Sequence, residues 1–370
     1  MSRKLKRNTK VEDIIESSKE PVKRELKILT TDKLIPSGST MINLACSDNP
    51  FGAYVKGTIV NIIGDTSAGK SFLILTMLAE ICYDKRFDKY DLYYDDVEQT
   101  LEFDLKELFG LKFVKRIKLK ASTYAEEVWD NIFAIKKSKT PFIYAVDSWD
   151  ALKSHYEEKK ESVNVGKRAR GQKEEGSYGD GKAKILHKIC RQSIKDIERE
   201  DSLLIFVSQT KDNWGPDAQF NPKIVTGGNA IKFFPSHRVW LTIIGRDYEL
   251  KREIGVESKV KVVKNKFTGK RRNVNIPIYY SYGVDDIGSC VRFLNSDFGG
   301  NYWKTKTKKI KDKDKSITAI DAIEFNIFLK EKELIRYIED NNLEKDLKLI
   351  VGKVWIDLEE KVKLDRKPKY

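Results

Sequence analysis

One eight-residue segment constrains the fold of this chain more than any other feature. Residues 64–71 read GDTSAGKS, which matches the pattern G-x-x-x-x-G-K-[ST] in full. The segment follows a short β-branched run, TIVNIIG at 58–64, and its last serine opens SFLILTMLAEICYD, whose apolar content is typical of a helix. A strand, a glycine-rich loop and a helix in this order predict a phosphate-binding loop in an α/β domain.

The spacing of this loop suits the phosphates of a nucleotide. Glycines let consecutive backbone N–H groups point at phosphate oxygens, and the following helix adds its positive N-terminal end. Lys70 can reach the β- and γ-phosphates, and the Ser71 hydroxyl can coordinate Mg²⁺. We therefore predict that a nucleotide with Mg²⁺ is held by Gly64, Asp65, Thr66, Ser67, Ala68, Gly69, Lys70 and Ser71.

Further short apolar runs indicate the rest of the sheet. They alternate with helix-length segments such as 123–138 and 183–199, which favours a mostly parallel sheet. Two stretches with period-two alternation, 258–266 and 273–281, suit a more exposed edge of the same sheet. The other expected strands lie at 91–96, 116–121, 141–148, 203–209 and 238–245.

Polar residues at the ends of three expected strands are candidates for the chemistry. Asp147 ends the apolar run FIYAVD, as the carboxylate that orders magnesium beside a phosphate loop should. Asp95, Asp96 and Glu98 follow another strand, and each is placed to orient or deprotonate an attacking water. Spacing alone does not choose among these three. Gln209 ends LLIFVSQ, where its amide can donate to a γ-phosphate.

Two long stretches, 157–182 and 210–229, are expected to lack regular structure, and loops of this length are usually functional or disordered.

The chain carries 70 Lys and Arg against 56 Asp and Glu, a surplus of fourteen that fits either a general lysine bias or a nucleic-acid footprint. Cations and aromatic rings in these stretches suit single-stranded nucleic acid. The residues concerned are Lys167, Arg168, Arg170, Lys211, Trp214, Phe220 and Lys223.

The remaining regions and the composition limit the class of protein. No run of about 18 apolar residues predicts a membrane span, and the scattered cysteines and histidines favour a reduced cytosolic setting without a zinc site. Residues 1–32 are polar and contain a possible short helix for a subunit contact. We expect 286–370 to be a basic, mainly helical region, with 304–315 as a linker or mobile surface and helices over 319–342 and 343–364.

These segments, taken in order, resemble the RecA family of strand-exchange ATPases. The resemblance covers about residues 33–283, the proposed core being 33–285. The block GGNAIKFF together with VKNK is far more specific than a phosphate loop alone. Phage-type UvsX-like recombinases are similar in size and in their short N-terminal segment. The segments are 35–71, YYDDVEQTLEFD (93–104), IYAVDSWDAL (143–152), IFVSQTKDNWG (205–215), TGGNAIKFFPSHRVWLTIIG (226–245) and VKVVKNK (260–266).

The resemblance implies a RecA-like fold, with a twisted, mostly parallel central sheet flanked by helices and a small helical C-terminal region. It implies that Glu98 is the catalytic glutamate and that Gln209 senses the γ-phosphate and opens the second DNA loop. The two DNA loops are then about 157–182 and 210–229, the second including Gly227, Gly228 and Asn229.

Further roles follow from the resemblance alone. Lys264 and Lys266 match lysines that reach the nucleotide of a neighbouring subunit, where a cation would neutralise transition-state charge. Glu102 and Phe103 lie where the family contacts adenine. The chain departs from bacterial members in its longer, more basic first loop and in lacking a clear counterpart of their polymerisation helix.

The implied function is an ATP-dependent recombinase that forms a helical filament on single-stranded DNA and exchanges strands with a homologous duplex in recombination, repair and recombination-dependent replication. Its reaction is DNA-dependent hydrolysis of ATP to ADP and phosphate. Expected partners include a single-strand-binding protein and a loading mediator, in the cytoplasm of a bacterial host if the chain is phage-encoded. Two alternatives stay open: a hexameric helicase motor of the same fold, and a recombinase paralogue or mediator that does not exchange strands.

Overall fold

The computed structural model describes residues 30–102, 104–173, 180–213, 215, 219, 223–225, 228–309 and 316–366. Contacts divide the chain into Met1–Thr30 and Thr31–Tyr370, and the second unit holds everything described below. Most of the segment 1–32, with its expected subunit-contact helix, lies outside the described residues, as do Phe103, Trp214, Phe220 and Gly227.

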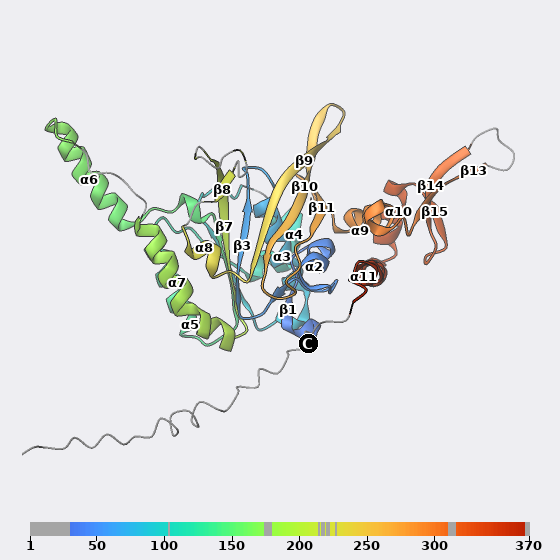
Figure 1. Ribbon diagram of the computed structural model, residues 1–370, viewed down its shortest axis with the longest axis horizontal. Helices are drawn as coiled ribbons and strands as arrows, with labels where there is room; N and C mark the ends of the chain where they lie inside the picture. Colours follow the sequence, from blue (N-terminus) through green and yellow to red (C-terminus); the bar gives the residue numbers. More distant parts are fainter. Residues whose placement is uncertain are drawn as a thin grey trace, which may run out of the picture. The chain divides into compact units, whose positions relative to one another are not determined.

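A ten-stranded sheet in the described part organises this unit (Figure 1). Its strand order is β12-β11-β10-β9-β3-β7-β6-β4-β5, with β8 attached to β7. Strands β9, β3, β7, β6, β4 and β5 are parallel, and β10, β11 and β12 continue the sheet antiparallel. The bounds are β3 Thr58–Gly64, β4 Asp91–Asp96, β5 Ile117–Lys120, β6 Phe142–Asp147, β7 Leu203–Asp212, β8 Lys223–Val225, β9 His237–Glu249, β10 Arg252–Asn265, β11 Asn273–Tyr279 and β12 Gly283–Val284.

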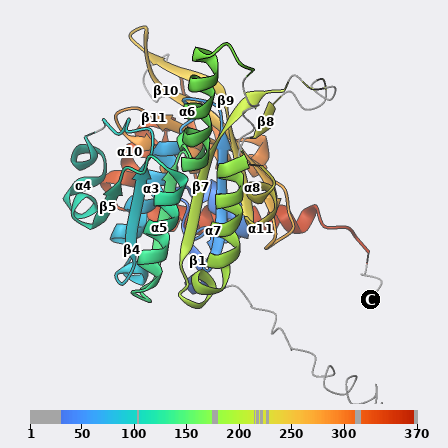
Figure 2. The ribbon, with the colours of Figure 1, turned by 90° about the vertical axis from the view of Figure 1, so that its left-hand side faces the viewer.

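Helices cover both faces of the sheet, which confirms the predicted α/β class. Strand residues alternate between two cores: Leu204 and Phe206 of β7 pack under α5 (Ala125–Lys136), α7 (Asp180–Arg199) and α8 (Ala230–Phe233). These three helices lie together over one face in Figure 2. Their sequence neighbours Leu203 and Ile205 point to the other core. That core includes α2 (Thr40–Ser47), α3 (Lys70–Tyr83), α4 (Leu105–Arg116) and α9 (Asp286–Leu294).

Parallel pairing places the predicted strand-end residues at one edge of the sheet. Gly64 of β3 is in register with Gln209 of β7, and Asp96 of β4 is in register with Asp147 of β6. Because all four strands run in the same direction, residues from four distant parts of the sequence meet around the phosphate loop.

The first expected loop is largely helical, so the prediction of irregular structure over 157–182 was wrong for its first half. Helix α6 spans His155–Ala169 and projects beyond the sheet (Figure 1). It begins with a capping box, in which the Ser154 side chain accepts from the Glu157 backbone N–H and Glu157 bonds back to the Ser154 N–H. The glycines and charges misled the prediction because Glu and Lys are also good helix formers. Residues 174–179 lie outside the described residues.

The C-terminal region contains a small sheet as well as helices, which corrects two expectations. Residues 304–309 form strand β13 rather than a linker, and 319–329 form the end of one strand, a turn and a second strand instead of a helix. Period-two burial in β14, where Ile320 and Ala322 are buried and Asp321 is not, explains the strand. The bounds are β13 Lys304–Lys309, β14 Ser316–Ala322, β15 Ile327–Leu329, α10 Glu331–Asp340 and α11 Glu344–Lys361, with 310–315 outside the described part.

The remaining short elements connect the larger ones. They are η1 Thr31–Lys33, β1 Leu34–Ile35, β2 Tyr54–Val55, η2 Lys85–Phe87, η3 Trp149–Ala151 and η4 Asp297–Gly299. Across the described residues, every helix is too short or too polar to cross a membrane.

Candidate nucleotide and DNA site

The phosphate loop joins the end of β3 to the start of α3, as the sequence predicted. Gly69 has φ +87°, a left-handed conformation that glycine adopts without strain. Lys70 is only 8% exposed, and its Nζ donates to the backbone oxygen of Asp65 at 2.6 Å. Burial lowers the pKa of Lys70, and the nearby carboxylates of Asp147 and Glu98 oppose that shift. The ammonium is therefore directed into the loop, where phosphate oxygens would solvate it.

Asp147 lies beside Ser71, where a magnesium ligand is needed. Its carboxylate is 6% exposed and accepts a hydrogen bond from Tyr94 Oη at 2.7 Å. Burial raises the pKa of Asp147, while hydrogen bonds from Ser71 and Tyr94 and the charge of Lys70 lower it. A hydroxyl and a buried carboxylate oxygen fit Mg²⁺, which usually takes one or two protein ligands and completes its shell with phosphates and water.

The three acids at the end of β4 and just beyond it have different partners. Asp95 is fully buried and accepts from Ser122 N, Ser122 Oγ and Tyr144 Oη at 2.8, 2.7 and 2.6 Å. Asp96 accepts from the backbone N–H of Leu101 at 3.0 Å. The Asp95 and Asp96 carboxylates therefore hold the local structure, whereas Glu98 accepts only from side chains, as described next.

Glu98 and Gln209 are in direct contact. Gln209 Nε2 donates to Glu98 Oε1 at 2.7 Å, and Ser148 Oγ donates to the same oxygen at 2.7 Å. A small cavity of about 70 Å³ lies between the start of α3 and the ends of β4 and β6. It is lined by Ser71, Tyr94, Asp96, Glu98, Thr100, Leu101 and Asp147. Glu102 is exposed and does not line this cavity.

Three contacts that sequence reasoning missed tie the β7–β8 hairpin to this site. The Gln209 backbone N–H donates to Asp150 Oδ2 at 2.6 Å. The Asp65 carboxylate, inside the phosphate loop, accepts from Thr210 Oγ1 and pairs with Lys223 Nζ at 2.6 Å. These partners are 145 and 158 positions from Asp65, so no local pattern could have revealed them.

Lys264 and Lys266 lie at the opposite edge of the sheet from Ser71. Lys264 pairs in register with Arg238 at the start of β9, whereas Gly64 pairs with Leu241 farther along that strand. The Lys264 ammonium donates to the backbone oxygens of Lys232 and Phe233, and Lys266 donates to those of Phe233 and Phe234. Burial, followed by the charges of Lys266 and Arg238, lowers the pKa of Lys264 to about 8. Neither lysine meets the phosphate loop of its own chain.

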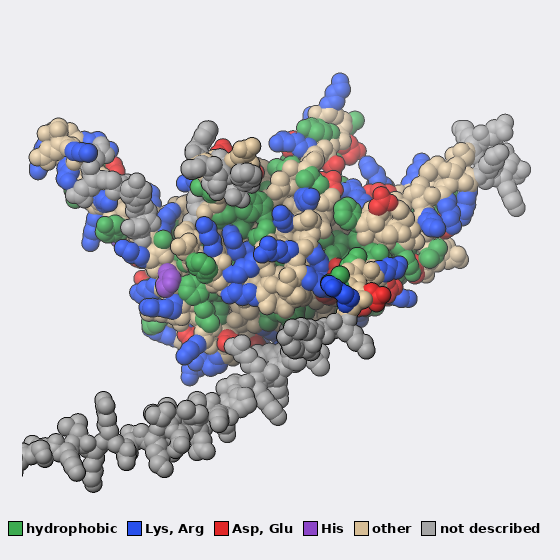
Figure 3. All heavy atoms as spheres, viewed as in Figure 1, with side chains coloured by type: hydrophobic (Ala, Val, Ile, Leu, Met, Phe, Trp, Pro, Cys, Tyr) green, Lys and Arg blue, Asp and Glu red, His purple; other side chains and the backbone are tan. Residues whose placement is uncertain are grey.

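The predicted DNA residues fall in two separate places. Lys167, Arg168 and Arg170 lie at the end of α6, and Arg168 pairs with Glu161 at 2.6 Å. Figure 3 shows basic side chains gathered at the tip of this helix and at the tip of the β9–β10 hairpin. Lys211, Gly228 and Asn229 are exposed near the phosphate-loop edge, where Lys223 is also found.

Comparison with known proteins agrees with this architecture. The family model described as RecA N-terminal domain matches residues 22–285. Protein RecA of Petrotoga mobilis is 27% identical over 255 residues, covering 68% of this chain and 62% of that protein. Protein RecA of Xanthomonas axonopodis pv. citri is 27% identical over 72% of each chain, and that of Mesoplasma florum is 28% identical over 75% of this chain and 78% of the relative.

Proposed function

The chain belongs to the RecA family, and from that premise we propose that it is an ATP-dependent recombinase that assembles on single-stranded DNA and exchanges strands with a homologous duplex. The observation that carries the proposal is the physical link between the nucleotide site and the β7–β8 hairpin. Glu98 contacts Gln209 at 2.7 Å, and Asp65 contacts Lys223 at 2.6 Å. Those contacts give ATP and DNA a route by which each can alter the binding of the other.

The residues of the phosphate loop bind and polarise the triphosphate. Backbone N–H groups and Lys70 take the β- and γ-phosphates, and Lys70 is already held inside the loop. Ser71 and Asp147 would hold Mg²⁺, which supplies charge neutralisation between the phosphates. Tyr94 fixes the Asp147 carboxylate by donating to Oδ2, so the oxygen on that side is oriented before nucleotide enters.

Glu98 orients and polarises the attacking water. Both of its hydrogen bonds within the described residues go to Oε1, from Ser148 and Gln209. Oε2 is therefore available to accept a proton from a water directed at the γ-phosphate. Asp95, which is saturated by Ser122 and Tyr144, is left to hold the end of β4.

Gln209 reports the state of the γ-phosphate to the second DNA loop. A γ-phosphate oxygen competes with Glu98 for the Gln209 amide, and the amide lies at the base of the hairpin that leads into 210–229. A change of partner at Gln209 therefore moves or orders that loop. By linkage, DNA that stabilises the same loop conformation raises affinity for ATP.

A second copy of the chain completes the site. Lys264 and Lys266 are at the edge opposite to the phosphate loop, so a head-to-tail neighbour can present them to the γ-phosphate. Such an interface repeats along a filament and does not close on itself unless the rotation permits a ring. The relatives are named Protein RecA, and no observation favours the helicase or mediator alternatives.

Strand exchange measured by fluorescence tests the proposal. A labelled single strand is incubated with the protein and ATP, and a homologous or unrelated duplex is then added. We expect strand transfer with the homologous duplex only, and its loss in Lys70→Ala, which removes the cation in the loop. ATP hydrolysis stimulated by DNA without strand transfer would contradict the recombinase assignment and favour a motor.

A further inference from the structure

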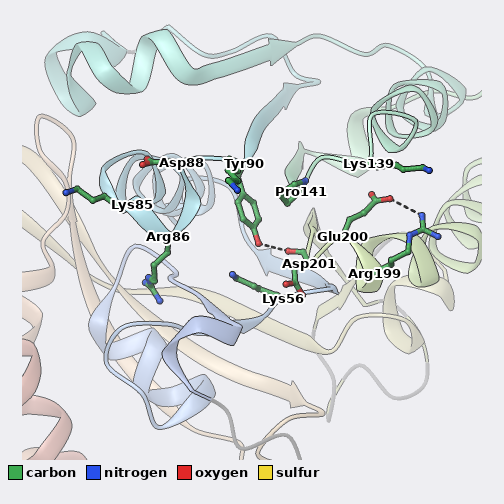
Figure 4. A pocket seen from close by; sticks show the side chains of 11 residues that line it. Lys56, Lys85, Arg86, Asp88, Tyr90, Lys139, Pro141, Arg199, Glu200 and Asp201 are labelled. Carbon is green, nitrogen blue, oxygen red and sulfur yellow. Dashed lines mark hydrogen bonds and ion pairs between the residues drawn. The ribbon is translucent and has the colours of Figure 1, made fainter.

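A hollow lies at the edge of the sheet opposite to the phosphate loop. It has a volume of about 720 Å³ and is lined by the segments that precede strands β3, β4, β6 and β7. Because the strands are parallel, this N-terminal edge is separate from the site built by their C-terminal ends. Figure 4 shows the lining side chains, which are Lys56, Lys85, Arg86, Asp88, Lys89, Tyr90, Lys139, Pro141, Arg199, Glu200 and Asp201.

The lining has an excess of positive charge, with six cationic and three acidic side chains. Both arginines are already paired, Arg86 with Asp84 and Arg199 with Glu200 and Asp196. In contrast, Lys85, Lys89 and Lys139 are exposed, and within the described part no carboxylate lies within 4.0 Å of their ammonium groups. The unpaired charge therefore belongs to lysines on two separate loops that line the hollow, and in Figure 4 the Lys85 and Lys139 side chains extend outward from opposite sides of it.

Lys56 gives the hollow a fixed cation. Its Nζ lies 5.2 Å from the centre of the Phe87 ring and 5.5 Å from that of Tyr90, and Tyr90 is held in place by donating to the Asp201 backbone oxygen at 2.9 Å. Burial lowers the pKa of Lys56; Asp201 raises it, and Arg86 lowers it further. An anion bound here would offset both the cost of burying the Lys56 ammonium and its repulsion by Arg86.

The chemistry of the wall indicates phosphate groups rather than a base or a carboxylate. The cations without a carboxylate partner are all lysines, which act as point charges toward phosphate, whereas planar carboxylates are matched best by arginine forks. Tyr90 is only 8% exposed, so no open ring face is offered to a base. The hollow is also larger than a single phosphate requires, and its lysines come from different loops.

We propose that this hollow, defined by Lys56, Lys85, Lys89 and Lys139, is a binding site for the phosphodiester backbone of a nucleic acid, distinct from the two DNA loops. It would hold a segment by charge and without base readout. The site does not require the phosphate loop, and it therefore stands apart from the proposed ATP-dependent reaction.

The test is the salt dependence of DNA binding by a triple variant, Lys85→Gln, Lys89→Gln and Lys139→Gln. A matched control replaces three other exposed lysines, Lys106, Lys115 and Lys195, with Gln. Both variants lose the same charge, and neither alters a buried residue. Binding of a short fluorescent duplex and of a single strand is measured over a range of salt concentrations, with pyrophosphate as a competitor.

For the triple variant we expect the slope of log K against log [salt] to shrink by about 2 relative to the control, because each lost phosphate contact removes roughly 0.7–0.9. A change with the duplex, the single strand or both identifies the occupant and supports the site. If the triple variant gave the same slopes as the control variant with both duplex and single-stranded DNA, the proposed site would be ruled out. Weaker pyrophosphate binding without any change for DNA would also rule it out.

The ATPase of the triple variant separates this proposal from the proposed function. With saturating single-stranded DNA we expect its ATP hydrolysis to match that of the wild type, since the lining of the hollow includes neither the phosphate loop nor Glu98, Lys264 or Lys266. If the wild type shows no DNA-stimulated hydrolysis, the proposed function fails while the salt slopes still decide the hollow.

Discussion

At the scale of single residues, hydrogen-bond partners separate acids that the sequence could not rank. Asp95, Asp96 and Glu98 lie at the end of the same strand and just beyond it, but Asp95 is saturated by three donors and Glu98 contacts the candidate sensor Gln209. Replacing a buried, fully hydrogen-bonded carboxylate lowers the stability of the fold, whereas replacing a carboxylate that faces the reacting water lowers the rate of hydrolysis. The two roles can be measured independently.

Glu98→Gln should retain ATP and DNA binding but lose at least about 100-fold in the rate of hydrolysis, because a general base contributes roughly 10²–10⁴. Asp95→Asn is the matched comparison and should lower stability by about 1–3 kcal/mol, since it disturbs buried bonds from Ser122 and Tyr144. Single-turnover hydrolysis and chemical denaturation measure the two effects. A Glu98→Gln protein that no longer binds ATP would show that Glu98 is structural.

His237 provides a pH dependence that is independent of catalysis. It is fully buried between the rings of Tyr54 and Phe267, and burial lowers its pKa from 6.5 to about 4. Between those values the unfolded chain binds more protons than the folded one, so stability falls as pH falls below 6.5.

Between pH 7 and pH 5, the titration of His237 should lower the free energy of unfolding by about 2 kcal/mol. Urea unfolding of the wild type and of His237→Phe at both pH values isolates the contribution of His237. Both proteins have the same carboxylates, so the effect of these groups on the free energy of unfolding cancels in the comparison. Equal losses of stability in the two proteins would mean that His237 does not titrate in this way.

At the scale of elements, the β7–β8 hairpin is attached to the phosphate loop at two points. Lys223 of β8 pairs with Asp65, and Thr210 of β7 donates to the same carboxylate. Next to these contacts, Gln209 of β7 contacts Glu98. The Asp65–Lys223 pair is partly exposed, so its contribution to stability is below about 1 kcal/mol. Under the proposed function its importance lies in coupling, because it joins the phosphate loop directly to the proposed second DNA loop.

Asp65→Asn and Lys223→Gln should each reduce, several-fold, the factor by which an ATP analogue tightens single-stranded DNA binding. The double variant should be no worse than either single one, because both changes break the same contact. Lys211→Gln in the same hairpin is the control and should weaken DNA binding equally with and without nucleotide. Additive losses in the double variant would refute a direct link.

The elements also show what sequence could and could not predict. The pattern of residues 58–71 was sufficient to predict β3, its loop and α3, because the glycine spacing and the flanking apolar runs agree. Helix α6 was missed because its buried face is a single asparagine, Asn164, so no apolar periodicity marks it. Strand β14 was taken for a helix because its short apolar run fits both periods. The contacts of Asp65 and Asp150 could not be predicted from the sequence, because they join residues that only the folded chain brings together.

At the scale of the whole molecule, the proposed active site is divided between two parts of the chain that do not meet. The phosphate loop and Glu98 lie at the C-terminal ends of the strands, and Lys264 and Lys266 lie at the other end of the sheet. Under the proposed function, a complete site therefore requires two chains in a head-to-tail arrangement, which is the geometry of a filament.

Mixing two inactive variants tests this shared site. Lys70→Ala lacks the loop cation, and the variant with both Lys264→Ala and Lys266→Ala lacks the lysines in trans. In a mixed assembly about a quarter of the interfaces join an intact loop to intact lysines if the subunits mix at random. We expect DNA-dependent ATP hydrolysis to return on mixing. Activity no higher than that of the separate variants would show that the lysines act within their own chain.

Electron microscopy of the protein with single-stranded DNA and a non-hydrolysable ATP analogue tests the central claim most directly. The account predicts a continuous helical filament along the DNA, which shortens or dissociates when ADP replaces the analogue because Gln209 loses its γ-phosphate partner. Closed rings on the DNA, with no filament under either nucleotide, would contradict the recombinase assignment.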